Sequence, residues 1–115
     1  IYNTNKFKTD LMNSYAWDTA ILFIQKFSND SLYSIKTDGS KIMKNTGKTG
    51  DKVCNIFDMS GNLPEWTTET YTGVSGPCVF RGGSQGSDQR YTSQRDCRSV
   101  NDVLNWITFR AILYF

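Results

Sequence analysis

The most constraining stretch of this sequence runs from Asn55 to Trp66 and reads Asn-Ile-Phe-Asp-Met-Ser-Gly-Asn-Leu-Pro-Glu-Trp. Its aromatic and aliphatic residues predict burial, and the Ser-Gly-Asn at 60–62 predicts a tight turn, because glycine and asparagine tolerate turn geometry. The simpler interpretation is that the turn shapes the backbone while Trp66 anchors the core. Two carboxylates, Asp58 and Glu65, flank the turn, and oxygen ligands suit a hard cation such as calcium. Both interpretations stay open on these residues alone.

The length, charge and composition of the chain exclude several classes of function. Its 115 residues suit one domain, 1–115, with a single core. A formal net charge of +2 is too small and too dispersed to indicate nucleic acid binding. The sequence has no histidine, which removes serine–histidine and cysteine–histidine catalysis and histidine-ligated zinc. No apolar run approaches the ~20 residues of a membrane span, so we expect no membrane insertion.

The cysteines and the first residues carry less information. Cys54, Cys78 and Cys97 are widely spaced, and their odd number argues against a complete disulfide scaffold. We expect small buried thiols, although one pair could bridge in an extracellular setting. The chain begins Ile-Tyr-Asn, without a methionine or a signal peptide, so we expect it to be a piece of a longer chain.

Hydrophobic periodicity predicts one helix. Asn13 and Ser14 are good N-cap residues, and apolar side chains then recur at helical spacing until about residues 28–30. Leu22 and Phe23 broaden the apolar face, which predicts burial on more than one side. We expect loop for residues 1–13 and a polar surface excursion for 30–52, with a short turn near 32–35.

Two strands and a closing strand follow. Residues 66–71 and 78–81 have strand character, and Gly82-Gly83 permits a backbone that other residues resist. Residues 107–115 alternate between apolar and other side chains, which predicts one strand inside a sheet, away from an exposed edge. Between them, residues 84–105 are polar and too long for an ordinary connection, and long loops of that kind are usually functional.

Four motifs in order resemble the formylglycine-generating-enzyme-like (sulfatase-modifying-factor) family. Residues 56–66 resemble its "GN-V-W-E-W" core, residues 80–84 its "RGGS" motif and residues 108–110 its "GFR" closing strand, while Trp17-Asp18 stands where the family has its "E-W-E" helix. The resemblance implies an α+β, C-type lectin-like fold, with a small twisted antiparallel sheet, a flanking helix and long irregular loops. The family's first strand and first helix are not evident, so we expect the carboxy-terminal part of that domain.

The resemblance implies a fold without the family's chemistry. In the enzymes of the family, cysteines after the "RGGS" motif carry the oxidation, whereas residues 85–89 here read Gln-Gly-Ser-Asp-Gln. We therefore expect no catalytic residues, no required cofactor and no enzyme activity of that type. The family's calcium site carries over only in part, because Pro64 replaces its usual aromatic residue. Its expected ligands are the side chains of Asp58 and Glu65 and the backbone carbonyls of Gly61 and Leu63.

The non-enzymatic branch of the family implies ligand display. Its phage-encoded and retroelement-diversified members keep the scaffold and vary the loop before the closing strand, which here is the 85–106 loop. We expect a phage or prophage receptor-binding (tail fibre or tip) domain or a diversified surface protein, located in the virion or at a cell surface. The simpler alternative is a polar surface loop that binds nothing and covers a buried Trp106. The expected contact residues are Gln85, Ser87, Asp88, Gln89, Tyr91, Arg98, Asn101, Asp102, Asn105 and Trp106.

Several alternatives remain at this level. The expected partner is a host-surface protein or glycan, and a homo-oligomer such as a trimer, or a larger virion assembly, would suit display. A structural cap in a larger virion or surface complex is the second hypothesis. A sulfatase-modifying-type oxidoreductase is the third, and it requires a reactive thiol.

Overall fold

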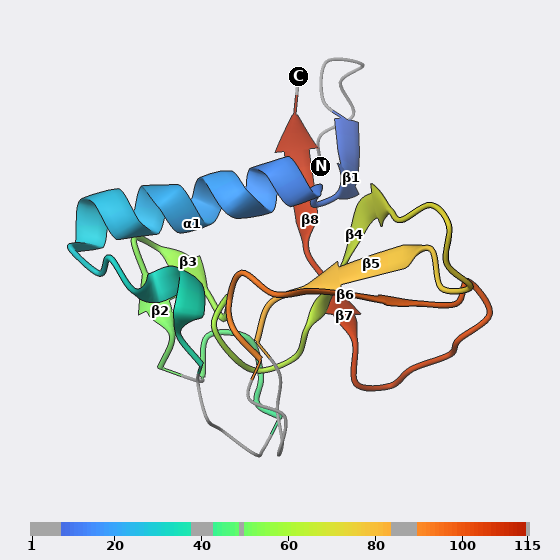
Figure 1. The fold of residues 1–115 in the computed structure, drawn as a ribbon. Helices are drawn as coiled ribbons and strands as arrows, with labels where there is room; N and C mark the ends of the chain where they lie inside the picture. The colour runs from blue at the N-terminus through green and yellow to red at the C-terminus, as the bar shows by residue number, and fades with distance from the viewer. Residues whose placement is uncertain (1–7, 38–42, 49, 84–89, 115) are drawn as a thin grey trace.

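The computed structural model describes residues 8–37, 43–48, 50–83 and 90–114. Within them it has the α+β composition that the sequence predicts, with one α-helix, one short 3-10 helix and three small sheets (Figure 1). The elements are β1 (Lys8–Leu11), α1 (Ser14–Ser28), η1 (Tyr33–Ile35), β2 (Lys52–Val53), β3 (Ile56–Phe57), β4 (Glu65–Thr70), β5 (Cys78–Arg81), β6 (Arg95–Arg98), β7 (Thr108–Phe109) and β8 (Ala111–Tyr114).

Helix α1 begins and ends where the sequence predicts. The Asn13 side chain accepts a 2.8 Å hydrogen bond from the backbone N–H of Ala16, and Asn29 ends the helix with a left-handed φ of 58°. One face packs into the core, where Trp17 and Ile24 are buried together with Met12, Ile21, Tyr33 and Met59. The expected burial on a second side is wrong, because Leu22, Phe23 and Phe27 face solvent.

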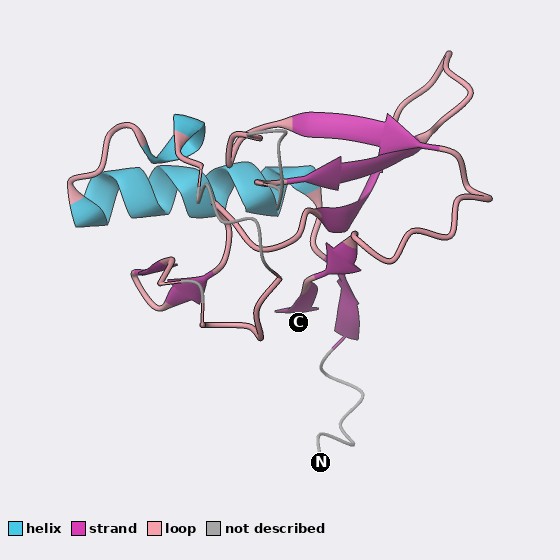
Figure 2. Cartoon of the chain, turned by 90° about the horizontal axis from the view of Figure 1, so that it is seen from below, coloured by secondary structure: helices cyan, strands magenta, loops and turns pink. Residues whose placement is uncertain are grey.

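The largest sheet has the strand order β6-β5-β4-β7, with antiparallel pairing except between β4 and β7 (Figure 1). Phe80 of β5 lies opposite Trp66 of β4 and Asp96 of β6, so these side chains share one face. Arg81, the next residue, points to the other face and forms an ion pair with Asp18 of α1. The N-terminal part of α1 therefore lies against one face of this sheet (Figures 1 and 2). Phe80 lies on the opposite face, because it alternates with Arg81 along β5.

Two glycines at the end of β5 allow the chain to pack closely against residues 59–61. A Cβ on Gly83 would lie 2.2 Å from the carbonyl oxygen of Ser60. Gly82 has φ 94°, and a Cβ there would lie 2.8 Å from the ring of Trp17. Only glycine allows this close approach, which joins the helix, the turn and β5.

The ends of the described chain differ from the sequence expectation. Residues 8–11 form β1, which pairs antiparallel with β8, so the predicted loop is wrong there. The closing run is two strands, because the backbone changes partner at Arg110: β7 lies at the edge of the large sheet, whereas β8 pairs with β1 in a separate two-stranded sheet. Phe109 and Leu113 are exposed as a result. Among the described residues, no helix has both the length and the apolar character that crossing a bilayer demands.

Candidate functional site

The segment from residue 90 to residue 106 is divided and anchored, not a single free loop. Thr92 is fully buried, accepts a 2.9 Å hydrogen bond from the Trp17 indole through its carbonyl, and donates through its N–H and its hydroxyl to the carbonyl of Lys36. Residues 95–98 then form β6. The expectation of loop throughout is wrong at β6, whose Arg-Asp-Cys-Arg sequence lacks apolar alternation but pairs with β5 through its backbone.

An aromatic anchor holds β6 and the chain that follows it. We use this name for Trp66, Phe80 and Trp106 with the guanidinium groups of Arg90 and Arg98. The Phe80 ring, 1% exposed, meets Trp66 and Trp106 edge to face, with ring centroids 5.6 and 5.8 Å apart. The Arg98 guanidinium lies 5.8 Å from the Phe80 centroid and 5.7 Å from that of Trp106, and Arg90 lies 5.3 Å from Phe80.

A carboxylate orients the cations of the anchor. Asp96 accepts a 2.6 Å hydrogen bond from Arg90 and lies 3.9 Å from a guanidinium nitrogen of Arg98. Burial alone would raise the pKa of Asp96, but the hydrogen bonds from Arg90 and from the backbone N–H of Cys97 outweigh it and lower the pKa below its usual range. Asp96 therefore stays ionised and keeps both arginines against the rings.

Residues 99–105, which we call the display loop, leave the anchor and enter solvent. The backbone N–H of Asp102 donates to the carbonyl of Ser99 at 3.1 Å, and the N–H of Ser99 donates to the Asp102 carboxylate at 3.3 Å. This reciprocal turn shapes a loop in which most side chains are exposed, although Ser99 and Leu104 are half-buried. Val103 is 99% exposed and Val100 is 68% exposed.

A cavity of about 290 Å³ lies beside the display loop. Ser99, Val100 and Asp102 of the loop form one wall. The sheet and β1 form the other with Leu11, Trp66, Thr67 and Cys78. The loop thus combines a rigid base, outward apolar side chains and an adjoining hollow.

The structure separates the contact residues that the sequence predicts. Asn101, Asp102 and Asn105 are exposed in the display loop, whereas Arg98 and Trp106 belong to the anchor. Tyr91 is exposed but lies in the turn before β6, so the whole strand separates it from the display loop. Gln85, Ser87, Asp88 and Gln89 lie outside the described residues. From the sequence, Val100 and Val103 are expected to tuck inward, because valines in a polar segment usually pack against the core. That expectation is wrong, since both side chains are exposed in the display loop.

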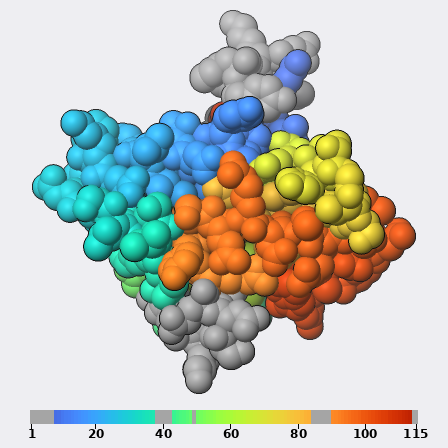
Figure 3. Space-filling model, in the orientation of Figure 1, coloured from blue at the N-terminus to red at the C-terminus, as the bar shows by residue number. Residues whose placement is uncertain are grey.

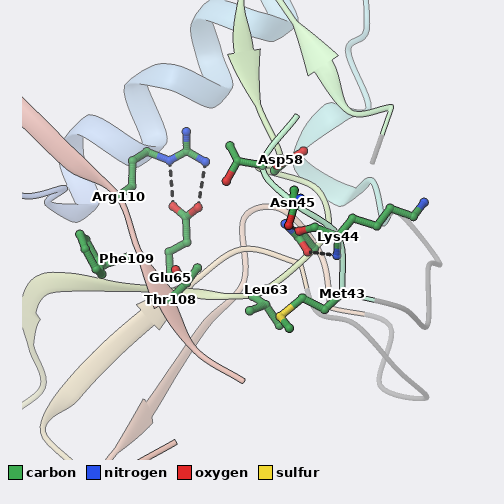
Figure 4. A pocket seen from close by; sticks show the side chains of 11 residues that line it. Met43, Lys44, Asn45, Asp58, Leu63, Glu65, Thr108, Phe109 and Arg110 are labelled. Atoms are coloured by element: carbon green, nitrogen blue, oxygen red, sulfur yellow. Dashed lines mark hydrogen bonds and ion pairs between the residues drawn. The ribbon is translucent and has the colours of Figure 1, made fainter. Parts of the chain in front are cut away.

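Three of the four calcium ligands expected from the sequence line a second cavity, of about 410 Å³ (Figure 4). Asp58, Leu63 and Glu65 are on its wall, and Gly61 is not among its lining residues. Both carboxylate oxygens of Glu65 accept hydrogen bonds from Arg110, at 2.8 and 2.9 Å (Figure 4). Arg110 also donates to the carbonyl of Phe57 at 2.7 Å.

The guanidinium of Arg110 stands where a cation would need to bind Glu65. Burial raises the pKa of Glu65, and the charge and hydrogen bonds of Arg110 oppose that rise. No group of three or more acidic, cysteine or histidine side chains in the described ranges is placed to hold a metal ion. Because Arg110 engages both Glu65 oxygens, this donor set does not fit calcium, and calcium titration would test that conclusion.

The three thiols are free and do not form a pair. Cys97 lies opposite Val79 and Cys78 lies opposite Arg98, so the two cysteines project from opposite faces of the sheet. Cys54 is exposed in the turn between β2 and β3. The expectation of buried thiols is therefore wrong for Cys54, which has a left-handed φ of 50° in that turn.

Comparison with known proteins agrees with the motifs. A family model described as "Sulfatase-modifying factor enzyme 1-like domain" matches residues 3–113. No curated protein and no solved structure matches the chain. Since the family model covers nearly the whole sequence, and the turn, the glycine pair and the Arg110 strand junction all form parts of one frame, the chain belongs to the sulfatase-modifying factor enzyme 1-like (FGE-sulfatase) family.

Proposed function

We propose that this protein is a non-catalytic ligand-binding domain that recognises a macromolecular ligand through the display loop. The observation that carries the proposal is the contrast between the anchor and the loop. Phe80 is almost fully buried under two arginines and two tryptophans. Val100 and Val103, which lie in the sequence between Arg98 and Trp106 of the anchor, are exposed. Interfaces gain affinity when the binding residues are already held in place before the ligand arrives.

The chemistry of the display loop supports non-covalent recognition. Val100 and Val103 offer apolar area, whereas Asn101 and Asn105 offer amide donors and acceptors. The adjoining 290 Å³ cavity can receive a side chain or a sugar ring of the ligand. These features suit a host-surface protein or a glycan, which are the partners expected for a receptor-binding domain.

The thiol arrangement supports the non-catalytic part of the proposal. A disulfide-forming or metal-binding thiol pair needs two sulfur atoms on the same side of the backbone. Cys78 and Cys97 are on opposite faces, and neither has a thiol partner. Labelling of the native protein with a thiol reagent should show only ordinary thiol reactivity, greatest at exposed Cys54. A thiol with strongly enhanced reactivity near pH 6 would contradict this.

A setting in a phage tail or on a cell surface, and a C-type lectin-like arrangement of the frame, belong to the same proposal. The support is the resemblance of the motifs to short non-enzymatic members of the family and the small α+β frame with irregular loops. A structural cap is the competing function. Protection of the display loop from proteolysis in the intact assembly, but not in the isolated domain, would favour the cap.

The proposal can be tested without knowing the natural ligand. The immobilised domain is screened against a random-peptide display library and a glycan array, and the selected ligands are measured against variants. The pair Val100→Ser/Val103→Ser should weaken binding at least tenfold while the melting temperature stays unchanged. Leu32→Ser is the control, because Leu32 is exposed outside the loop. Equal binding by the loop variant and the wild type would refute the placement of the site.

A further inference from the structure

The outward face of α1 is apolar although it is exposed to solvent. Tyr15 is 87% exposed, Leu22 65% and Phe27 67%, and the rings of Phe23 and Phe27 lie 4.7 Å apart. Figure 3 shows α1 along the upper left border of the molecule. We define the α1 outward face by the residues that the helical period places opposite the buried side: Tyr15, Thr19, Leu22, Phe23, Lys26 and Phe27.

This composition reverses what a surface helix normally shows. The opposite side of α1 already buries Trp17, Ile21 and Ile24, so packing among the described residues does not require the apolar residues of the outward face. An amphipathic surface helix places polar and charged residues toward water. Here Lys26 is the single charge on the outward face, and leaving the other side chains in water forgoes about 1.5–3 kcal/mol for each large apolar group.

The exposed area matches what a small dimer requires. An aromatic side chain can bury 150–250 Å², so the four apolar side chains at their observed exposures offer on the order of 500 Å² per chain. Two copies joined by this face would bury on the order of 1,000 Å², which is the lower limit for a specific interface. The face is therefore large enough for a second copy of itself, and the dimer should be weak.

The order of residues along the face selects an antiparallel pairing. A two-fold axis midway between Leu22 and Phe23 would place each Leu22 against the partner copy's Phe23, because the two side chains lie on opposite sides of that axis at 100° per residue. Each Lys26 would then lie over the other copy's Thr19, an uncharged residue. A parallel pairing would instead set Lys26 against Lys26, which costs energy.

We propose that two copies of this chain associate through their α1 outward faces as an antiparallel, two-fold dimer. This inference is independent of the proposed ligand-binding function. The display loop is anchored on the face of the large sheet opposite α1, so the dimer would leave both display loops accessible.

The first test is sedimentation velocity of the purified chain from about 5 to about 300 µM, the range in which an interface of this size should dissociate. The wild type should change from monomer to dimer. Leu22→Glu should stay monomeric with an unchanged melting temperature. Leu32→Glu should dimerise like the wild type, and it is matched because Leu32 is also 65% exposed but lies outside α1. A wild-type monomer at every concentration, a trimer, or equal dimerisation of both variants would overturn the proposal.

The second test fixes the orientation of the helices. In a Cys54→Ser background, Leu22→Cys should be joined to its own copy by a short bis-maleimide, because packed helices are 8–10 Å apart near the axis. Tyr15→Cys should not be joined, because antiparallel pairing separates the two positions by roughly 20 Å along the helices. Efficient cross-linking at Tyr15→Cys, or none at Leu22→Cys, would overturn the antiparallel arrangement.

Discussion

Replacing Arg110 by methionine should destabilise the frame more than any surface change. The Glu65 carboxylate is 8% exposed, and Arg110 supplies both of its hydrogen bonds from one guanidinium as well as a third bond to the carbonyl of Phe57. Removing one partner of a buried pair leaves an uncompensated charge and costs about 3–5 kcal/mol. A domain of this length has a total stability of roughly 6–17 kcal/mol, so the variant should fold but unfold at much lower denaturant.

The assay is urea unfolding of a mutant cycle at low temperature. Arg110→Met and Glu65→Gln should each be strongly destabilised. The double variant should lose less free energy of unfolding than the two single variants together, by at least about 2 kcal/mol. Arg110→Lys is the matched control: it keeps the charge but loses the planar fork and should fall between the wild type and Arg110→Met. A loss below about 1 kcal/mol for Arg110→Met, as for an exposed pair, would refute the reasoning.

Three further predictions concern acid stability, packing and calcium. Because the folded-state pKa of Asp96 is lowered, its contribution to stability is present above its ordinary pKa and is lost as the pH falls from about 4; Asp96→Asn should remove this part of the acid dependence of urea midpoints, and an unchanged profile would contradict the anchor. Gly83→Ala should cost about 1–3 kcal/mol by collision with the Ser60 carbonyl, whereas Gly73→Ala, which meets only open space but has φ 88°, should cost about 1–2 kcal/mol, so the larger loss for Gly73→Ala would contradict the packing. Calcium should leave the melting temperature of the wild type unchanged, since Arg110 holds both Glu65 oxygens; a rise would restore the calcium site that the turn suggested.

Local patterns in the sequence predicted the elements that local chemistry determines. Helix α1 follows from the Asn13 cap and the spacing of Trp17, Ile21 and Ile24. Strand β5 follows from its apolar residues and the Gly82-Gly83 pair that ends it. The family motifs added the order of these parts, which the family model confirms over residues 3–113.

The elements that failed are those determined by distant partners. Strands β1 and β6 have polar sequences, and they form because their backbones pair with β8 and β5. The closing run looked like one strand, but Arg110 turns to Glu65 and divides it between two sheets. The candidate site failed in the same way, because nothing local shows that Arg98 packs on Trp106 while Val103 faces solvent.

The most direct test of the account is ligand affinity measured beside thermal stability for the loop and anchor variants. Val100→Ser/Val103→Ser should lose at least tenfold in affinity for a selected peptide or glycan without a change in melting temperature, because both side chains are largely exposed. Trp106→Ala should instead lower both, because it removes a ring from the anchor. Full affinity in the double valine variant would contradict the claim that a rigid frame presents residues 99–105 to a ligand.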